Sequence, residues 1–248
     1  NLGVGVYFDD NGKLPLLACV QAAEKAMMAV PTARGYLPID GIVAYDNAVK
    51  SLVFGADSEP VQSGRVATVQ AIGGTGGLKI GADFLKKISP DAKVLISDPS
   101  WENHRALFTN AGFVVDTYAY YDAAKRGVNF EGMLASLNAA APGTIVVLHA
   151  CCHNPTGYDI TPAQWDQVIA VVKAKGLTPF LDMAYQGFGH GIAEDGAVIG
   201  KFVAAGLNFF VSTSFSKSFS LYGERVGGLS VLCASKDDAD RVMSQLKV

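Results

Sequence analysis

Short runs of apolar residues, many of them β-branched, recur along the chain and alternate with segments whose apolar positions are spaced as on one face of a helix. Such runs are typical of buried strands, and the spacing between them is typical of amphipathic helices. Two further helices are expected ahead of the first strand, within residues 14–30 and 37–55. The runs predict seven strands, at residues 65–72, 93–97, 113–120, 144–150, 178–183, 208–214 and 227–233.

The alternation of helix and strand predicts the α/β class, as a three-layer αβα arrangement around a mostly parallel seven-stranded sheet. The link from Lys217 to residues 227–233 is too short for a crossover helix, so the last strand is expected to be antiparallel. We expect one large domain over residues 1–248, with a helical segment at about 1–60 and the sheet in 61–248. The chain starts as if in mid-fold and stops inside an apparent amphipathic helix, as a piece of a longer protein would.

Composition narrows the class of protein further. The chain has 248 residues, of which 50% are hydrophobic and 17% charged, enough to bury a core. Its net charge of −3 gives no positive field, so nucleic acid is not an expected partner. No apolar run approaches the roughly 20 residues that cross a bilayer and no signal-peptide pattern opens the chain, so we expect no membrane association and a cytoplasmic location. The four cysteines lack CxxC spacing and predict neither a disulfide framework nor a zinc site.

Unusual residues gather in the loops that follow the predicted strands. In parallel α/β sheets, ligands bind beyond the carboxyl ends of the strands, so these loops are expected to meet. The first, GGTGG at residues 73–77, offers free backbone N–H groups and a helix N-terminus to a phosphate. It matches neither GxGxxG nor a P-loop, and close packing of the helix on the sheet would explain its glycines equally well.

Lys217 stands in the last of these loops among small hydroxyl and aromatic residues, in SFSKSFS. Burial in such a setting lowers the pKa of a lysine, which suits a catalytic base or an amine that captures an aldehyde. The alternative is a lysine at a strand end that reaches solvent. Arg225 in the same loop could bind phosphate through two nitrogens, unless the adjacent Glu224 neutralises it.

Asp182 ends an apolar strand, where a buried carboxylate needs a cationic partner such as a protonated ring nitrogen. An ordinary helix N-cap is the alternative for this aspartate. Tyr185 could place its phenol near the same ring, and Trp101 could stack on an aromatic ligand or simply pack in the interior. Asn154 could bind a phenolic oxygen, although NPTG is also a good turn sequence.

Three histidines, His104, His149 and His153, could form a metal site. No carboxylate lies at ligand spacing from them in the sequence, so hydrogen-bonding support behind the site is the favoured interpretation, and no metal is expected. Together these loops supply a phosphate cradle, a ring platform, a partner for a pyridinium and an aldehyde-capturing amine. That combination describes a site for pyridoxal 5'-phosphate.

The stretches SFSKSFSLYGERVGG, LDMAYQGFGHG, HNPTG, DPSWENH and YLPIDG resemble the class I aminotransferases of the aspartate and aromatic amino acid type, along essentially the whole chain. The resemblance implies that Lys217 bonds the cofactor aldehyde, that Asp182 pairs with the ring nitrogen, and that Trp101 stacks on the ring. Asn154 and Tyr185 would contact the ring oxygen. The phosphate would be held by Gly74, Thr75, Ser214 and Arg225.

The same resemblance implies that Tyr36 reaches the phosphate of a neighbouring subunit, and therefore a homodimer with shared sites. Gly5 would meet the substrate carboxylate, with Trp101 and Asn154 also near the substrate, while His104 and His149 would lie behind the ring and tune Asp182. Where the family's phosphate loop often has serine, this chain has Gly73. The family's two substrate-carboxylate arginines, and its small C-terminal domain, lie beyond the chain.

We therefore expect transamination of tyrosine and phenylalanine, with aspartate as a secondary substrate and a 2-oxo acid such as 2-oxoglutarate as acceptor. Phe8 supports this choice, because aspartate-selective relatives tend to have arginine at the matching position. Three alternatives stay open: an aspartate aminotransferase, a catalytically silent cofactor-binding domain of a regulator, and a dinucleotide-binding oxidoreductase. The failed GxGxxG match disfavours the last.

Overall fold

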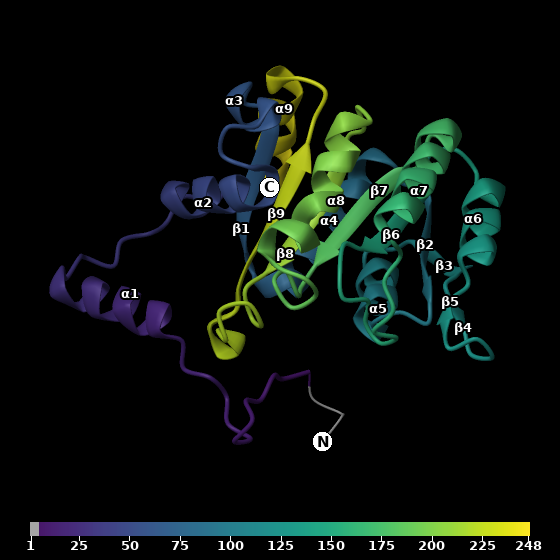
Figure 1. Cartoon of the computed structure of the whole chain (residues 1–248). Helices are drawn as coiled ribbons and strands as arrows, with labels where there is room; N and C mark the ends of the chain where they lie inside the picture. Colours follow the sequence, from purple (N-terminus) through teal and green to yellow (C-terminus); the bar gives the residue numbers. More distant parts are fainter. Residues whose placement is uncertain (1–4) are drawn as a thin grey trace.

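A computed structural model describes residues 5–248 and shows an α/β fold built around one seven-stranded sheet (Figure 1). The strand order is β1-β9-β8-β7-β6-β2-β3, and only β9 runs antiparallel to its neighbours. The predicted fold class is therefore confirmed, including the antiparallel last strand. The strands of this sheet are β1 (Val66–Ile72), β2 (Lys93–Asp98), β3 (Val114–Ala119), β6 (Ile145–His149), β7 (Thr178–Met183), β8 (Phe209–Ser214) and β9 (Val226–Leu232).

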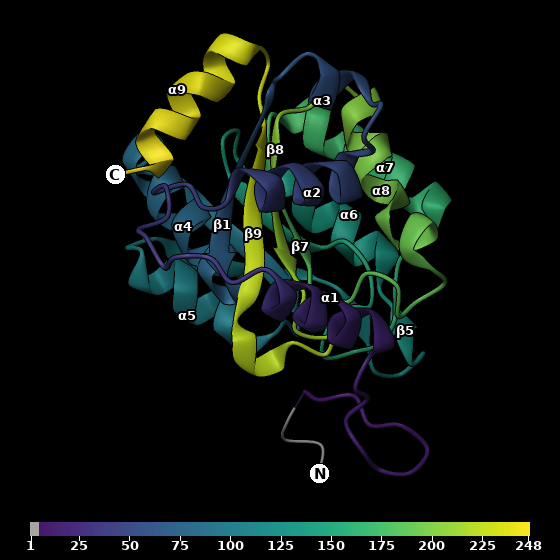
Figure 2. The same cartoon turned by 90° about the vertical axis from the view of Figure 1, so that its left-hand side faces the viewer.

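Helices cover both faces of the sheet, and each face has its own hydrophobic core (Figure 2). One face carries α4 (Gly73–Ile88), α5 (Glu102–Asn110) and α9 (Lys236–Leu246). The other carries α2 (Val43–Phe54), α6 (Phe130–Ala139), α7 (Pro162–Lys175) and α8 (Ile192–Ala204). These seven helices and the sheet form the three predicted layers.

Buried side chains alternate between the two cores along each central strand. In β8, Phe209 and Val211 belong to the core under α2 and α8, whereas Phe210 belongs to the core under α4. Successive side chains of a strand point to opposite faces, and both faces here are covered by helices. A strand buried on both sides therefore reads as a continuous apolar run, which is why the strands were predictable.

Helix α7 begins and ends at residues that are typical of helix termini. Thr161 and Gln164 form a capping box, and Pro162 occupies the first helical position. Gly176 ends the helix in the left-handed conformation that glycine adopts without strain. The position of α7 is thus fixed locally, next to the turn at residues 150–157.

Three elements were not predicted: the one-turn α3 (Glu59–Gln62), α6, and a hairpin of β4 (Tyr121–Asp122) and β5 (Gly127–Val128). The N-terminal α1 (Ala18–Ala29) was predicted, but it buries no residue and lies apart from the sheet in Figure 1. Met27 and Met28 on this helix are largely exposed. Among the described residues, no helix is long and apolar enough to span a membrane.

Candidate active site

A pocket of about 150 Å³ opens at the carboxyl ends of β6, β7 and β8. Every residue predicted to hold the cofactor lines it except Tyr36, so the predicted loops do meet at one edge of the sheet. The pocket is lined by Gly74, Thr75, Trp101, His149, Asn154, Asp182, Ala184, Tyr185, Ser214, Ser216, Lys217, Tyr222 and Arg225.

The first turn of α4 forms one wall of the pocket. This helix has no side-chain N-cap, so its first backbone N–H groups are free to bind an anion. Its glycines are also required by packing, since a Cβ on Gly77 would lie 2.6 Å from the carbonyl oxygen of Gly228. The packing interpretation is therefore confirmed, because the glycines let α4 approach the sheet. The same approach presents the free N–H groups, and phosphate binding by them stays a prediction.

Arg225 lies against this turn. A Cβ on Gly73 would come within 2.6 Å of an Arg225 guanidinium nitrogen, so a larger residue at 73 would displace the arginine. Arg225 donates from Nη1 to Ser216 Oγ at 3.3 Å and to the Tyr222 carbonyl at 3.0 Å. Within residues 5–248 it forms no ion pair, with Glu224 or any other carboxylate. Its positive charge therefore faces the pocket without a compensating protein anion.

Lys217 follows β8 by three residues and is partly buried in the pocket wall. Its ammonium nitrogen lies 5.0 Å from the centroid of the Tyr185 ring. Burial lowers the pKa of Lys217; the charge of Asp182 opposes this shift and the charge of Arg225 adds to it. The lysine therefore lines the pocket, and its partial burial makes its proton easier to lose than that of an exposed lysine.

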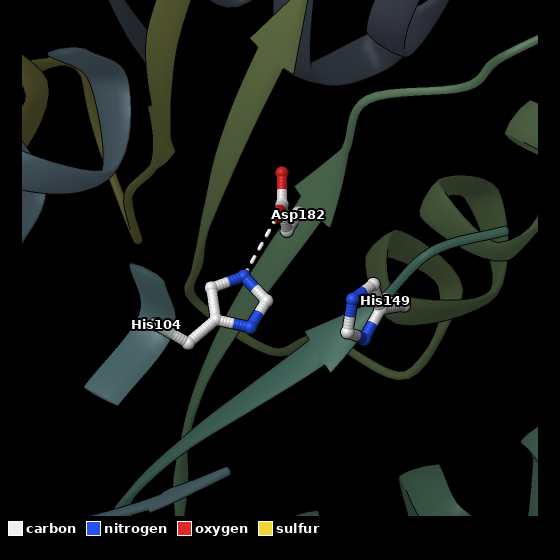
Figure 3. A group of neighbouring side chains, drawn as sticks. All are labelled: His104, His149 and Asp182. Atoms are coloured by element: carbon white, nitrogen blue, oxygen red, sulfur yellow. Dashed lines mark hydrogen bonds and ion pairs between the residues drawn. The ribbon is translucent and has the colours of Figure 1, made fainter. Parts of the chain in front are cut away.

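Asp182 lies inside β7, and the next helix begins only at Ile192, so the N-cap interpretation is wrong. The side chain is almost fully buried, and its Oδ2 accepts a hydrogen bond from His104 Nε2 at 2.7 Å (Figure 3). The other carboxylate oxygen points away from His104 in this view. Ser100 Oγ bonds the second nitrogen of the His104 ring at 2.9 Å. This chain fixes the carboxylate from behind and leaves one oxygen for a ligand.

The fold corrects one inference about the histidines. Asp182, remote in sequence, comes so close to His104 and His149 that their ligand atoms lie within 4.8 Å of one another. A carboxylate is therefore within metal-ligand distance after all. Both ring nitrogens of His104 are already hydrogen-bonded, however, so a metal ion that bound His104 would have to replace its contact with either Ser100 or Asp182.

His149 and His153 continue the cluster behind the pocket. Both ring nitrogens of His149 are buried and have no hydrogen-bond partner among residues 5–248, and burial lowers the pKa of His149 well below the usual range. His153 stacks on Tyr120, and its two nitrogens contact the hydroxyls of Ser97 and Thr156. Burial lowers the pKa of His153 to about 3. Both rings are therefore neutral near pH 7.

The ring-facing residues come from three loops. Trp101 caps α5 and meets His104 edge-on, with ring centroids 5.4 Å apart. Asn154 lies in the turn after β6, and Tyr185 follows β7. The pKa of Tyr185 is raised, chiefly by burial and next by the charge of Asp182. These three residues thus bring an indole, an amide and a phenol to the pocket, whose lining also includes Tyr222.

Three predicted residues do not line the pocket. A Cβ on Gly5 would be 3.9 Å from the Tyr185 hydroxyl, so this backbone passes beside the pocket. Phe8 is half-exposed, and Tyr36 is fully exposed. Within the described part of one chain, the fold does not bring Phe8 or Tyr36 to the pocket lining.

Other residues were missed by the sequence interpretation. Tyr222 lies in the stretch that carries Lys217 and Arg225, and its hydroxyl accepts a hydrogen bond from the Tyr7 backbone at 2.9 Å. Asp159 accepts from the backbone N–H groups of Cys152 and His153, both at 2.7 Å. The position of Tyr222 between two predicted site residues was a usable signal, whereas nothing near Asp159 in the sequence indicates its role.

Comparison with known proteins agrees with this geometry. A family model described as aminotransferase class I and II matches residues 1–248. An aspartate aminotransferase of Pseudomonas aeruginosa is 63% identical over 247 residues, and the aromatic-amino-acid aminotransferase of Escherichia coli is 52% identical over 248. Each alignment covers 100% of this chain and 62% of the relative, so the chain spans less than two thirds of their length.

A solved structure gives the same match in three dimensions. The aromatic-amino-acid aminotransferase from Burkholderia pseudomallei, covalently bound to pyridoxal phosphate, is 65% identical and superposes with a TM-score of 0.97. The match covers 99% of this chain and 62% of that protein. The overall fold described above is therefore shared with a protein whose structure was solved with pyridoxal phosphate covalently bound.

Proposed function

Because the chain belongs to the class I and II aminotransferase family, we propose that its pocket binds pyridoxal 5'-phosphate and that the whole protein transfers amino groups between amino acids and 2-oxo acids. The observation that carries this proposal is the meeting of Lys217, Asp182 and Arg225 in one pocket. Lys217 would bind the aldehyde of the cofactor, Asp182 its protonated ring nitrogen and Arg225 its phosphate.

The lining fits the cofactor group by group. The free N–H groups of α4, the Ser214 hydroxyl and unpaired Arg225 suit a phosphate dianion. The free oxygen of Asp182 suits a pyridinium proton, and Asn154 with Tyr185 suits the ring oxygen. When bound, the cofactor supplies an electron-withdrawing ring that stabilises negative charge at the substrate α-carbon.

The protein's own groups perform the proton transfers. The pKa of Lys217 is lowered, chiefly by burial, so its neutral amine forms more readily than that of an exposed lysine, and this amine would take a proton from the substrate α-carbon and deliver it again one position away. Asp182, held by His104, keeps a positive charge on its partner through a buried hydrogen bond. The indole of Trp101 lines the same pocket and would stack on the cofactor ring, which would hold that ring in one plane.

For the substrate, we favour tyrosine and phenylalanine, with aspartate secondary and 2-oxoglutarate as a typical acceptor. Phe8 supports this choice, because it lies on the segment that Tyr222 holds through Tyr7 and offers an apolar side chain instead of a cation. An aspartate aminotransferase is the alternative enzyme. A silent cofactor-binding regulatory domain is the alternative outside enzymes, and measurable turnover would eliminate it.

We further propose a cytoplasmic homodimer with shared sites. Tyr36 is fully exposed, and α1 beside it buries no residue against its own chain, as expected for a segment that contacts a second subunit. In such a dimer Tyr36 of each subunit would reach the phosphate held by the other. Sedimentation of the full-length protein tests the dimer: a Tyr36→Phe variant should remain dimeric and bind the cofactor more weakly, and a monomer with full activity would overturn it.

The cofactor assignment is tested by borohydride reduction of the cofactor-saturated protein, followed by peptide mapping. We expect the pyridoxyl label on Lys217, and a Lys217→Ala variant should take up none. Lys79 and Lys201 serve as internal controls, since both form ion pairs on the surface. A label on either of these, or no label at all, would overturn the assignment.

A further inference from the structure

Two adjacent thiols lie directly behind the pocket. Cys151 and Cys152 follow the end of β6, and their sulfur atoms lie within 4.8 Å of each other and of a carboxylate oxygen of Asp195. In an extended strand, successive side chains point to opposite faces. Cys152 has a left-handed backbone with φ of 51°, which breaks that alternation and turns its side chain toward that of Cys151.

The backbone that holds this pair is fixed. The carboxylate of Asp159 accepts hydrogen bonds at 2.7 Å from the N–H groups of Cys152 and His153. Cys151 is buried and Cys152 is partly exposed, so an incoming reagent meets Cys152 first. A hydrogen bond from Cys151 lowers the pKa of the Cys152 thiol, while burial acts against that shift. The accessible thiol is thus also the more easily ionised one, and the thiolate is the reactive form.

The third member of the cluster is not free to bind a metal ion. Asp195 Oδ2 accepts from the N–H groups of Gly187 and Gly189, and Oδ1 accepts from His190, all within 2.9 Å. A zinc ion, which takes four ligands, would have to pull this carboxylate away from its loop. Two sulfur atoms remain, both soft ligands.

We propose that Cys151 and Cys152 form a chelating site for monosubstituted trivalent arsenicals. The arsenic atom would then form its three bonds to one organic group and to the two cysteine sulfurs. With an arylarsine oxide, two S–H bonds break and two As–S bonds form. The arsenic-bound oxygen leaves with both protons as water, and no oxidation state changes. The left-handed turn at Cys152 is the feature that makes two neighbouring residues able to share one arsenic atom.

Binding of an arsenical to Cys151 and Cys152 should also alter the cofactor pocket. This consequence rests on the proposed function. Cys152 Sγ donates to the Tyr185 carbonyl at 3.7 Å, and Asn154 is two residues away. Forming an As–S bond ends the contact with Tyr185 and strains the turn that carries Asn154. The two residues assigned to the ring oxygen are therefore both displaced, and cofactor absorbance and turnover should change on binding.

The site is tested with phenylarsine oxide and the full-length protein, by intact mass and by alkylation of unreacted thiols after unfolding. We expect one phenylarsenic group per chain, with Cys151 and Cys152 both protected. Cys151→Ser and Cys152→Ser should each weaken binding by about 100-fold or more, because the second sulfur no longer binds intramolecularly. The matched control Cys19→Ser, at an exposed cysteine, should bind like wild type.

A dithiol should reverse the adduct, and an equal concentration of a monothiol should not. Undiminished binding in either serine variant, protection of Cys19 instead, or no adduct on the folded chain would overturn the site. Should a serine variant fail to fold, differential alkylation and peptide mapping of the wild type decide the same question. An adduct that leaves turnover unchanged would refute only the link to the pocket, whereas failure of the proposed function would show as a missing cofactor spectrum in untreated protein.

Discussion

At the scale of single residues, the pocket is defined by an excess of positive charge. Lys217 and Arg225 both face it, while Asp182 is the one carboxylate in its lining, and His104 already binds one of that carboxylate's oxygens. Desolvated charges without partners are costly, so such a pocket favours an anionic ligand that completes the pairs. The residues that fill these roles are few, which makes single substitutions informative.

Asp182→Asn should leave the fold intact and lower turnover by about 100- to 1000-fold, because a neutral amide cannot hold a proton on the ring nitrogen. Steady-state kcat of the cofactor-saturated protein measures the effect. Asp166→Asn is the matched control, since Asp166 forms only a surface ion pair with Lys201. A cofactor analogue methylated at the ring nitrogen should partly restore the Asp182 variant. Turnover near the wild-type value would exclude the assigned role.

Phe8→Arg should shift substrate choice toward aspartate by placing a cation beside the substrate side chain. Burying a phenyl ring contributes roughly 1.5–3 kcal/mol, at most about a 100-fold preference, so the wild type should favour tyrosine and phenylalanine without excluding aspartate. The measurement is kcat/KM for all three amino acids with 2-oxoglutarate. If the wild type prefers aspartate by about tenfold or more, the alternative enzyme is the right one.

At the scale of elements, α4 links the packing of the fold to its chemistry. Its N-terminal glycines allow the helix axis to approach β8 and β9 closely, and a Cβ on Gly77 would lie 2.8 Å from Ser212 Oγ. The same approach directs the free N–H groups of the first turn into the pocket. Packing and anion binding therefore cannot be altered independently at this helix.

Gly77→Ala should destabilise the protein by about 1–3 kcal/mol through overpacking and should also weaken cofactor binding, because α4 must move outward. Gly200→Ala is the matched control: Gly200 is also helical, and an added Cβ there meets nothing within 4 Å. That variant should gain up to about 1 kcal/mol. Denaturant unfolding and cofactor titration measure both effects. Equal behaviour of the two variants would contradict the packing explanation.

The elements also show why part of the molecule was predictable and part was not. Strands such as β8 are buried on both faces and give continuous apolar runs, so their existence and their mostly parallel direction could be inferred. The hairpin of β4 and β5 has two residues in each strand, too few to carry any period. In the site, Lys217 and Asp182 line the pocket, and their unusual sequence context made that prediction possible. Ala184 and Ser216 line the pocket with ordinary side chains, which no local pattern distinguishes.

At the scale of the whole molecule, a cluster of three histidine rings is enclosed between the sheet and the turns at its carboxyl edge. The rings of His104 and His149 lie 4.9 Å apart, and those of His149 and His153 lie 4.3 Å apart. Burial lowers the pKa of His149 and of His153, which gives the fold a defined response to acid.

Stability should fall as the pH drops below 6.5, the ordinary value for histidine. The unfolded chain binds a proton at His153 near that pH, whereas the folded chain does so only at about 3, so acid favours the unfolded state throughout this window. The cost is about 1.4 kcal/mol per pH unit for each such histidine. His153→Gln should flatten the dependence of unfolding free energy on pH between about 4 and 6.5. An unchanged slope in the His153 variant would refute the assignment.

Asp46 provides an opposing contribution in part of the same range. Burial raises the pKa of its carboxyl to about 6, so the folded chain holds that proton more tightly than the unfolded chain, and stability from this group falls as the pH rises from about 4 toward 6. The measured slope of the wild type is therefore the sum of two opposite trends. Asp46→Asn should steepen the acid sensitivity that the histidines produce.

Because β9 lies between β1 and β8, the sheet cannot be completed until the last strand has been synthesised. β1 is an edge strand whose one neighbour is β9, with Val66 opposite Leu232, so these partners are separated by most of the sheet-forming sequence. During synthesis from the N-terminus, β1 must wait as an unpaired apolar strand while the parallel strands β2, β3, β6, β7 and β8 emerge. The arrival of residues 226–232 inserts the antiparallel strand between the two parts and closes the sheet. A nascent chain stalled before residue 226 should therefore expose β1 to chaperones, and the binding should end once β9 has left the ribosome.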